Sequence, residues 1–170
     1  MPFRGALLVG LLLAAGAPAV AQETAPRPGD HELHHHHVGV LVGAMTPLSE
    51  TSATSFALGA EYEYRFSQLF GTGLTTDFTL GDRKRTALVA TGVTYRLTPD
   101  LKVMTGPGFE VVDQDQPDGA TTSKVYFVWG FGAAYEFHVG SVSLTPMVLL
   151  DFVGETKTNL TYGIAIGTGF

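Results

Sequence analysis

Hydrophobic side chains alternate with small or polar ones from residue 38 to the end of the chain. In the last stretch, 159–170, bulky residues fall on one face and mostly Gly, Ala or Thr on the other. Residues i and i+2 share a face only in a β-strand, so the alternation predicts an all-β fold. Clusters of turn-forming residues interrupt the alternation and predict eight strands. These cover residues 38–46, 55–66, 70–80, 86–97, 101–112, 124–137, 142–152 and 159–170.

The expected connections between strands differ at the two ends of the sheet. Three are tight turns, namely 67–69, 98–100 and 138–141. Four are mostly longer and more polar, namely 47–54, 81–85, 113–123 and 153–158. This asymmetry is typical of outer-membrane proteins, and it predicts an eight-stranded antiparallel up-and-down transmembrane β-barrel. Pro107 and Pro146 fall inside strands, where proline removes a ladder hydrogen bond, and we expect a bulge at each.

The two faces of the predicted strands differ in size and polarity. One carries most of the aromatic side chains, and the other carries Gly, Ala and Thr with occasional charges. Because the interior of an eight-stranded barrel is just wide enough for side chains, a crowd of rings would overfill it. We therefore place the bulky face in lipid, with a girdle of aromatic residues near each end. The predicted girdle residues are Phe56, Phe66, Phe70, Phe78, Tyr95, Phe109, Phe127, Phe137, Phe152 and Phe170.

Ionisable residues on the small face form two groups, which need partners inside a barrel. The group near the tight turns holds both signs of charge and predicts a salt-bridge network that plugs the lumen. Its members are Glu61, Glu63, Arg65, Arg96, Lys102 and Glu136. The group near the longer loops is Asp77, Glu110 and Asp151, which predicts an acidic mouth. An alternative for both groups is that the charges only solvate a narrow interior.

The start of the chain differs from the rest. Residues 1–21 combine Arg4, an apolar stretch and a small-x-small pattern at 19–21, which predicts a secretory signal peptide. The apolar stretch is shorter than the roughly 20 residues that a membrane-spanning helix needs. Residues 22–37 begin with a polar, Pro-rich stretch and end in histidines, and we expect a periplasmic linker before a barrel domain at 38–170.

The closing residues Tyr162, Ile164, Ile166 and Phe170 share one face. This pattern resembles the C-terminal strand of Gram-negative outer-membrane β-barrels, although Thr168 stands where another apolar residue is usual. With the signal peptide and the strand count, residues 38–170 resemble small barrels of the OmpA and OmpX type. The resemblance implies an outer-membrane location, contact with lipid and lipopolysaccharide, and insertion by the barrel assembly machinery. We expect a monomer.

Candidate chemical groups are few. The chain has no Cys and a formal net charge of −6, so it offers no thiolate site and no basic surface for nucleic acid. Clustered imidazoles can bind a divalent metal ion, and we expect no other cofactor. The candidate ligands are His31, His34, His35, His36 and His37. His138 with Ser141 and Ser143 suggests a hydrolase, but His138 falls in a turn on the periplasmic side, and we expect no enzymatic activity.

These observations favour an outer-membrane barrel with a structural or surface-interaction role and a lumen too full for a general diffusion pore. One alternative is a narrow, porin-like channel, or a binder of a small ligand or cation at the acidic mouth. Another alternative is an enzyme that modifies lipid A.

Overall fold

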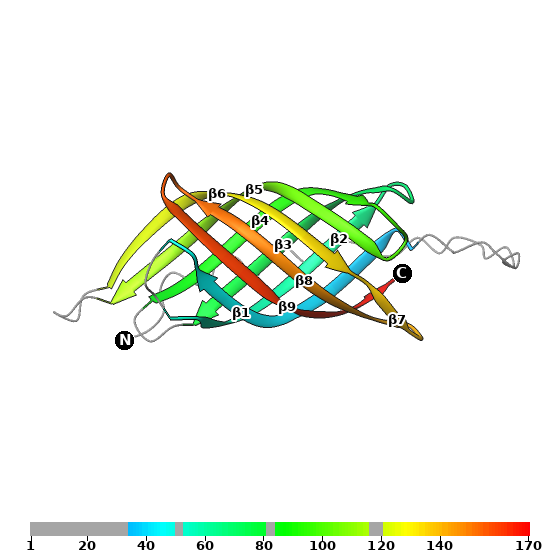
Figure 1. Cartoon of the computed structure of the whole chain (residues 1–170), viewed down its shortest axis with the longest axis horizontal. Coiled ribbons are helices and arrows are strands. Elements are labelled where there is room, and N and C mark those ends of the chain that lie inside the picture. Colours follow the sequence, from blue (N-terminus) through cyan, green and yellow to red (C-terminus); the bar gives the residue numbers. More distant parts are fainter. Residues whose placement is uncertain (1–33, 50–52, 81–83, 116–120) are drawn as a thin grey trace, which may run out of the picture. The chain divides into compact units, whose positions relative to one another are not determined.

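The computed structural model describes residues 34–49, 53–80, 84–115 and 121–170, so the signal peptide predicted at 1–21 and most of the expected linker lie outside the described residues. Within them, no helix is long and apolar enough to cross a bilayer. The described residues form nine β-strands (Figure 1). They are β1 (His36–Pro47), β2 (Ser55–Arg65), β3 (Phe70–Leu80), β4 (Lys84–Arg96), β5 (Leu101–Asp115), β6 (Thr121–Tyr135), β7 (Phe137–Val139), β8 (Val142–Val153) and β9 (Lys157–Gly169).

The strands pair antiparallel around a closed ring. β1 pairs with both β2 and β9, so the first and last strands are neighbours. β6 and β7 are two parts of one barrel strand, because both pair with β8 in the same register, Ala134 opposite Met147 and Phe137 opposite Leu144. The nine strands therefore make eight barrel strands, and the predicted eight-stranded up-and-down barrel is confirmed (Figure 1).

The connections define two ends of the barrel. At the turn end, the connections are 66–69, 97–100 and 140–141, and β1 begins and β9 finishes at the same end. At the loop end, the connections are 48–54, 81–83, 116–120 and 154–156. Several loop-end connections are shorter than predicted, because the strands extend into residues that were expected to form loops. For example, β4 begins at Lys84 and β9 begins at Lys157. The two ends therefore differ less in connection length than the sequence indicated.

Pro107 and Pro146 interrupt the ladders but form no bulge. Between β4 and β5, residues 91–92 and 106–107 are left out of the pairing, yet the register is the same on both sides of them. Opposite Pro146, the break between β6 and β7 also leaves the register unchanged. A bulge needs an extra residue in one strand, whereas proline only removes a donor. The predicted bulges are wrong for that reason.

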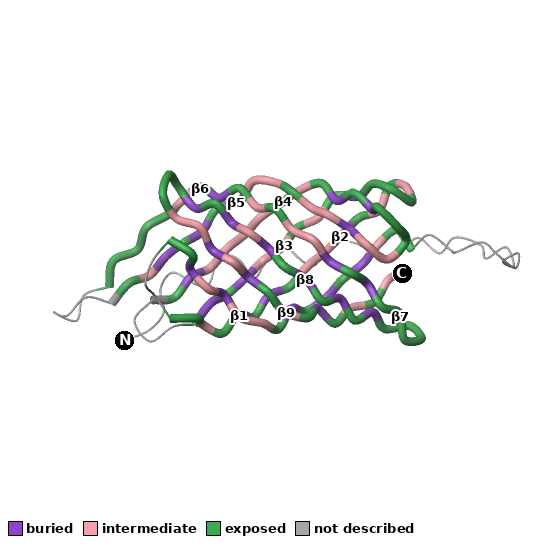
Figure 2. The backbone as a smooth tube through the Cα atoms, viewed as in Figure 1, coloured by how far each residue is buried: buried purple, intermediate pink, exposed green. Residues whose placement is uncertain are grey.

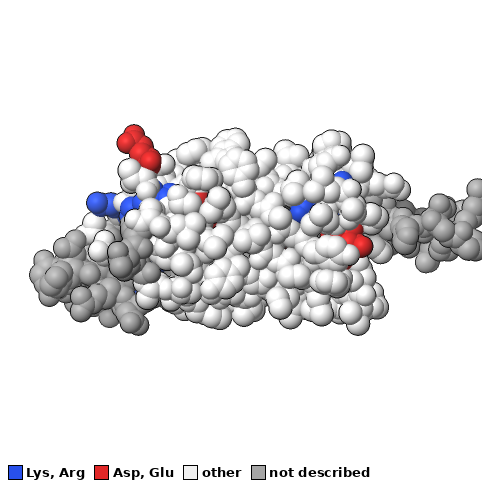
Figure 3. Space-filling view, in the orientation of Figure 1, with Lys and Arg blue, Asp and Glu red and all other residues white. Residues whose placement is uncertain are grey.

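The barrel buries charge and exposes bulky apolar groups. All ten aromatic residues expected in the girdles are exposed on its outer wall. Glu63, Arg96, Lys102 and Glu136 are buried inside it. Buried and exposed residues alternate along the strands in Figure 2, and charged atoms are few and lie mostly toward the two ends on the face that Figure 3 shows. An exterior of this kind is suited to acyl chains rather than to water.

Aromatic rings contact one another at both ends of the outer wall. At the turn end, the ring centroids of Tyr135 and Phe137 are 4.7 Å apart. At the loop end, Phe109 and Phe127 meet edge to face, with centroids 5.9 Å apart. Rings gathered at two heights are what the two lipid–water interfaces of a bilayer favour.

Candidate functional site in the barrel lumen

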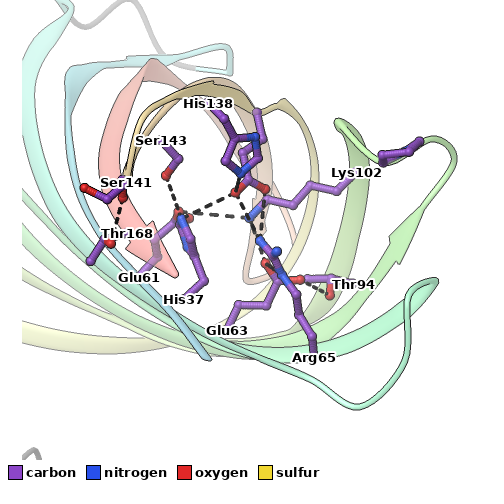
Figure 4. A network of polar contacts seen from close by, with 12 residues as sticks. His37, Glu61, Glu63, Arg65, Thr94, Lys102, His138, Ser141, Ser143 and Thr168 are labelled. Carbon is purple, nitrogen blue, oxygen red and sulfur yellow. Dashed lines mark hydrogen bonds and ion pairs between the residues drawn. The ribbon is translucent and has the colours of Figure 1, made fainter. Parts of the chain in front are cut away.

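The six residues predicted to plug the lumen meet near the turn end. Glu61, Glu63 and Arg65 point inward because they occupy alternate positions of β2. The other three come from different strands, Arg96 from the end of β4, Lys102 from the start of β5, and Glu136 from between β6 and β7. We call these six residues the ion-pair plug. Figure 4 shows the side chains of Glu61, Glu63, Arg65 and Lys102 converging inside the barrel.

Glu136 joins opposite walls of the barrel. Arg65 donates from Nη2 to its Oε1 at 3.2 Å and to its Oε2 at 2.9 Å. Arg96 donates to Oε2 from both terminal nitrogens, each at 3.1 Å. In the ring of eight barrel strands, β2 and the β6–β7 strand lie four positions apart, so the Arg65–Glu136 pair crosses the whole lumen.

Glu63 is the second centre of the plug. Its Oε2 accepts hydrogen bonds from Arg96 Nη2 and Lys102 Nζ, each at 3.2 Å. Its Oε1 accepts a hydrogen bond from the Thr94 hydroxyl at 2.8 Å. Glu61 is held by longer contacts, with Oε1 4.0 Å from Lys102 Nζ.

The electrostatics of the plug are balanced. Three carboxylates face three permanent cations, so the buried charges sum to zero. Taking ions out of water costs several kcal/mol each, and close pairing with good hydrogen bonds offsets that cost. Removing a member that several partners share leaves those partners charged and buried, which typically costs about 3–5 kcal/mol. The plug is therefore held as a unit.

Two histidines and a serine belong to the site although the sequence did not assign them to it. His37 is buried, and its Nε2 lies 2.8 Å from Ser143 Oγ and 3.7 Å from Glu136 Oε1. His138 Nε2 lies 3.2 Å from the same Glu136 oxygen. The sequence contains a pattern that could have placed His37 in the lumen. Gly39 and Leu41 point inward, and His37 lies two residues before Gly39, so it falls on the same face of the strand.

Ser143, His37 and Glu61 stand in the order of a nucleophile, a base and an acid. The Glu61 Oε1 lies 3.7 Å from His37 Nδ1, which is too long for a hydrogen bond. Ser143 is 2% exposed and His37 is 1% exposed. Ser141, the other serine of the suggested hydrolase, accepts a hydrogen bond from Thr168 at its backbone oxygen.

The histidines proposed as metal ligands point in different directions. His35 Nδ1 lies 2.8 Å from the backbone oxygen of Arg65, and the His36 ring stacks on Phe170 outside the barrel. His37 points into the lumen, His34 is exposed, and His31 lies outside the described residues. Among the described residues, no group of three His, Cys, Asp or Glu side chains could hold a metal ion. Metal binding by the histidine cluster stays a prediction.

The acidic residues expected at the mouth lie inside the lumen. Asp77, Glu110 and Asp151 are all buried, on β3, β5 and β8 respectively. Both carboxylate oxygens of Asp77 are buried without a hydrogen-bond partner. The sequence placed these residues correctly on the inward face, but burial of this depth depends on how closely the opposite wall approaches.

A scan against protein-family models and a search of curated protein sequences found no match to this chain. Solved structures do match it. Ail, the attachment invasion locus protein of Yersinia pestis, aligns at 12% identity with a TM-score of 0.60, over 81% of this chain and 100% of that one. Neisserial surface protein A aligns at 12% identity with a TM-score of 0.65, over 80% and 97%. The N-terminal barrel domain of Pseudomonas aeruginosa OprF aligns at 12% identity with a TM-score of 0.62, over 79% and 97%.

The chain has the fold of the eight-stranded outer-membrane β-barrels. Within this fold the outer wall faces lipid, which explains why bulky apolar side chains are exposed along its whole length. Because the outer wall faces lipid, polar side chains are accommodated in the lumen. In this chain they are the ion-pair plug and the acidic residues Asp77, Glu110 and Asp151.

Proposed function

We propose that this chain is an integral outer-membrane protein with a structural or surface-interaction role, and that its lumen is closed to solutes. The observation that carries the proposal is the Arg65–Glu136 pair, which joins opposite walls at 2.9 Å. Arg96 and Lys102 fill the space beside it through their bonds to Glu63 and Glu136. A barrel whose lumen is crossed by buried ion pairs serves as an anchor for its exposed loops rather than as a pore.

Conductance in planar bilayers tests the closed lumen. We expect no sustained single-channel steps from the refolded chain. Replacing both arginines of the plug, Arg65→Ala with Arg96→Ala, removes the cross-lumen pair and should produce such steps. Arg85→Ala is the matched control, since Arg85 is exposed near the loop end and its loss should leave the bilayer silent. Sustained steps from the unaltered chain would contradict the proposal.

Cell fractionation tests the location. When expressed in a Gram-negative host, the chain should be recovered with the outer membrane after insertion by the barrel assembly machinery. Unboiled and boiled samples should migrate differently on a gel, because a closed barrel has no free edge from which to unfold. Recovery of the chain in the aqueous fraction without detergent would overturn both the location and the role.

The proposal includes no catalytic step. Ser143 and His37 are both buried in the barrel. We therefore expect the mass spectrum of lipid A to be unchanged when the chain is expressed. A new lipid A species that disappears in a Ser143→Ala variant would favour a lipid-modifying enzyme instead.

A further inference from the structure

Two histidines approach one carboxylate of the ion-pair plug. His37, near the start of β1, is buried, and its Nε2 lies 3.7 Å from Glu136 Oε1. His138 on β7 is exposed at the turn end, and its Nε2 lies 3.2 Å from the same oxygen. The two imidazoles point toward one another in Figure 4. Imidazole is the side chain that most readily gains a proton as the pH falls below neutral, so the charge around Glu136 depends on pH.

Glu136 already has two permanent cations beside it. Arg65 Nη2 lies 2.9 Å and Arg96 Nη2 lies 3.1 Å from its Oε2. When both imidazoles are protonated, four positive charges surround this one carboxylate. Repulsion between like charges is strong where water is excluded, and His37, Arg96 and Glu136 are all buried. Acidification therefore opposes the pairing that holds the plug together.

One nitrogen of His37 is available for the proton. Its Nε2 shares a 2.8 Å hydrogen bond with Ser143 Oγ, whereas its Nδ1 is buried without a hydrogen-bond partner among the described residues. Glu61 Oε1, which is also buried and without such a partner, lies 3.7 Å from this Nδ1 and 4.0 Å from Lys102 Nζ. A proton on Nδ1 draws Glu61 toward His37 and away from Lys102, because hydrogen bonds between charged groups are the strong ones.

The plug holds no spare carboxylate for the added charge. The charged or titratable groups around His37 are Glu61, Glu63 and Arg65 on β2, Arg96 on β4, Lys102 on β5, Glu136 after β6 and His138 on β7. Three carboxylates balance three permanent cations when both imidazoles are neutral, so two added protons leave two positive charges uncompensated. Uncompensated charge inside a protein is costly, and protonation loosens the plug rather than tightening it.

We propose that the ion-pair plug is a pH-sensitive gate, which opens when the turn end of the barrel is acidified. Protonated His37 and His138 repel the arginines from Glu136, and the Arg65–Glu136 pair that crosses the lumen is released. Arg65 is the arginine that leaves more easily, because its side chain is 11% exposed and that of Arg96 is 6% exposed. The inference rests on the closed lumen proposed above and adds the condition under which the lumen opens.

Single-channel recordings of the refolded chain in planar bilayers test the gate, with both chambers taken from about pH 7.5 to about pH 4. We expect silence near neutral pH and sustained steps as the pH falls. The open probability should rise by up to about tenfold per pH unit for each proton taken up on opening. Silence of a folded barrel over the whole range would overturn the gate and leave the closed lumen standing. Sustained steps near neutral pH would overturn both.

Histidine variants identify the groups that take up the protons. His37→Gln can still hydrogen-bond to Ser143 but cannot be protonated, so it should stay silent at every pH. His138→Gln removes one of the two added charges and should make the rise in open probability less steep. His36→Gln is the matched control, because the His36 ring stacks on Phe170 outside the barrel, and it should open with acid as the unaltered chain does.

The variants also define the results that contradict the gate. Acid-induced steps that persist unchanged in His37→Gln would overturn it. The mobility of unboiled samples on a gel shows whether each variant folds. If His37→Gln does not fold, His138→Gln decides instead, and a rise in open probability as steep as that of the unaltered chain would overturn the proposal.

Discussion

Glu63 and Glu136 near the turn end, and Asp77 and Asp151 farther along the lumen, are buried to a similar degree, between 1% and 7% exposed. The first two are surrounded by Arg65, Arg96 and Lys102. Asp77 has neither a hydrogen bond nor an ion pair within the described part of the chain.

The difference between the two regions shows that burial alone does not decide what a charge does in a barrel. Where cations from other strands complete the group, the carboxylates hold the walls together. Where no such cation is present, as at Asp77, the same kind of side chain is buried without a hydrogen bond, which costs free energy. Substitutions in the two regions should therefore change stability in opposite directions.

The largest expected effect comes from Glu136→Ala. This change leaves the buried Arg96 and the partly buried Arg65 without their shared carboxylate. We expect the free energy of unfolding in detergent micelles, measured by urea titration, to fall by about 3–5 kcal/mol. Glu155→Ala, at an exposed position, is the control and should stay within about 0.5 kcal/mol. A loss below about 1 kcal/mol for Glu136→Ala would mean that the plug is solvated.

Lys102→Met should have a smaller effect in the same direction. Lys102 is 2% exposed, and methionine fills a similar volume without the charge. Glu63 keeps its bond to Arg96 Nη2, so fewer contacts are lost than in Glu136→Ala. We expect a loss of about 2 kcal/mol in the same urea titration, because a hydrogen bond to a charged group contributes about 1.5–3 kcal/mol. A loss as large as that of Glu136→Ala would show that the pairs in the plug are more strongly coupled than their geometry indicates.

Asp77→Asn should act in the opposite direction. In the absence of a cation, this variant replaces an unpaired carboxylate by a neutral amide of the same shape. We expect the free energy of unfolding to rise by about 1 kcal/mol, because burial of a charged carboxylate costs more than burial of a neutral amide. If Asp77→Asn instead lowered stability, the two regions would not differ as described.

The smallest expected effect belongs to Thr94 at the edge of the plug. Thr94 is buried on β4 and donates a 2.8 Å hydrogen bond to Glu63. Thr94→Val removes only the hydroxyl, and we expect a loss of about 1 kcal/mol, the usual contribution of one hydrogen bond. Thr86→Val, buried on the same strand, provides a matched comparison. Sustained conductance steps from Thr94→Val would show that the plug depends on this single contact.

Sequence reasoning captured the strands and their faces with little error. β3 begins and ends where the alternation places it, at Phe70 and Leu80, and β2 ends one residue earlier than expected. The six residues of the plug could be named from the sequence because each lies on the inward face near a tight turn. Two predictions failed where contacts between strands decide the outcome. The bulge expected at Pro107 is absent because the neighbouring strand keeps its register. His37, which was expected in the linker, lies in the lumen and contacts Ser143.

The sequence by itself determined that this chain forms a barrel with an apolar outside and a charged inside, because a period of two is a local property that each strand carries alone. Only the tertiary structure decided which charges meet. Whether a buried carboxylate lies beside an arginine, as Glu136 does, or has no hydrogen-bond partner, as with Asp77, depends on strand register and on which strands stand opposite each other after closure. Arg65 and Glu136 are 71 residues apart in the chain, and no local pattern connects them.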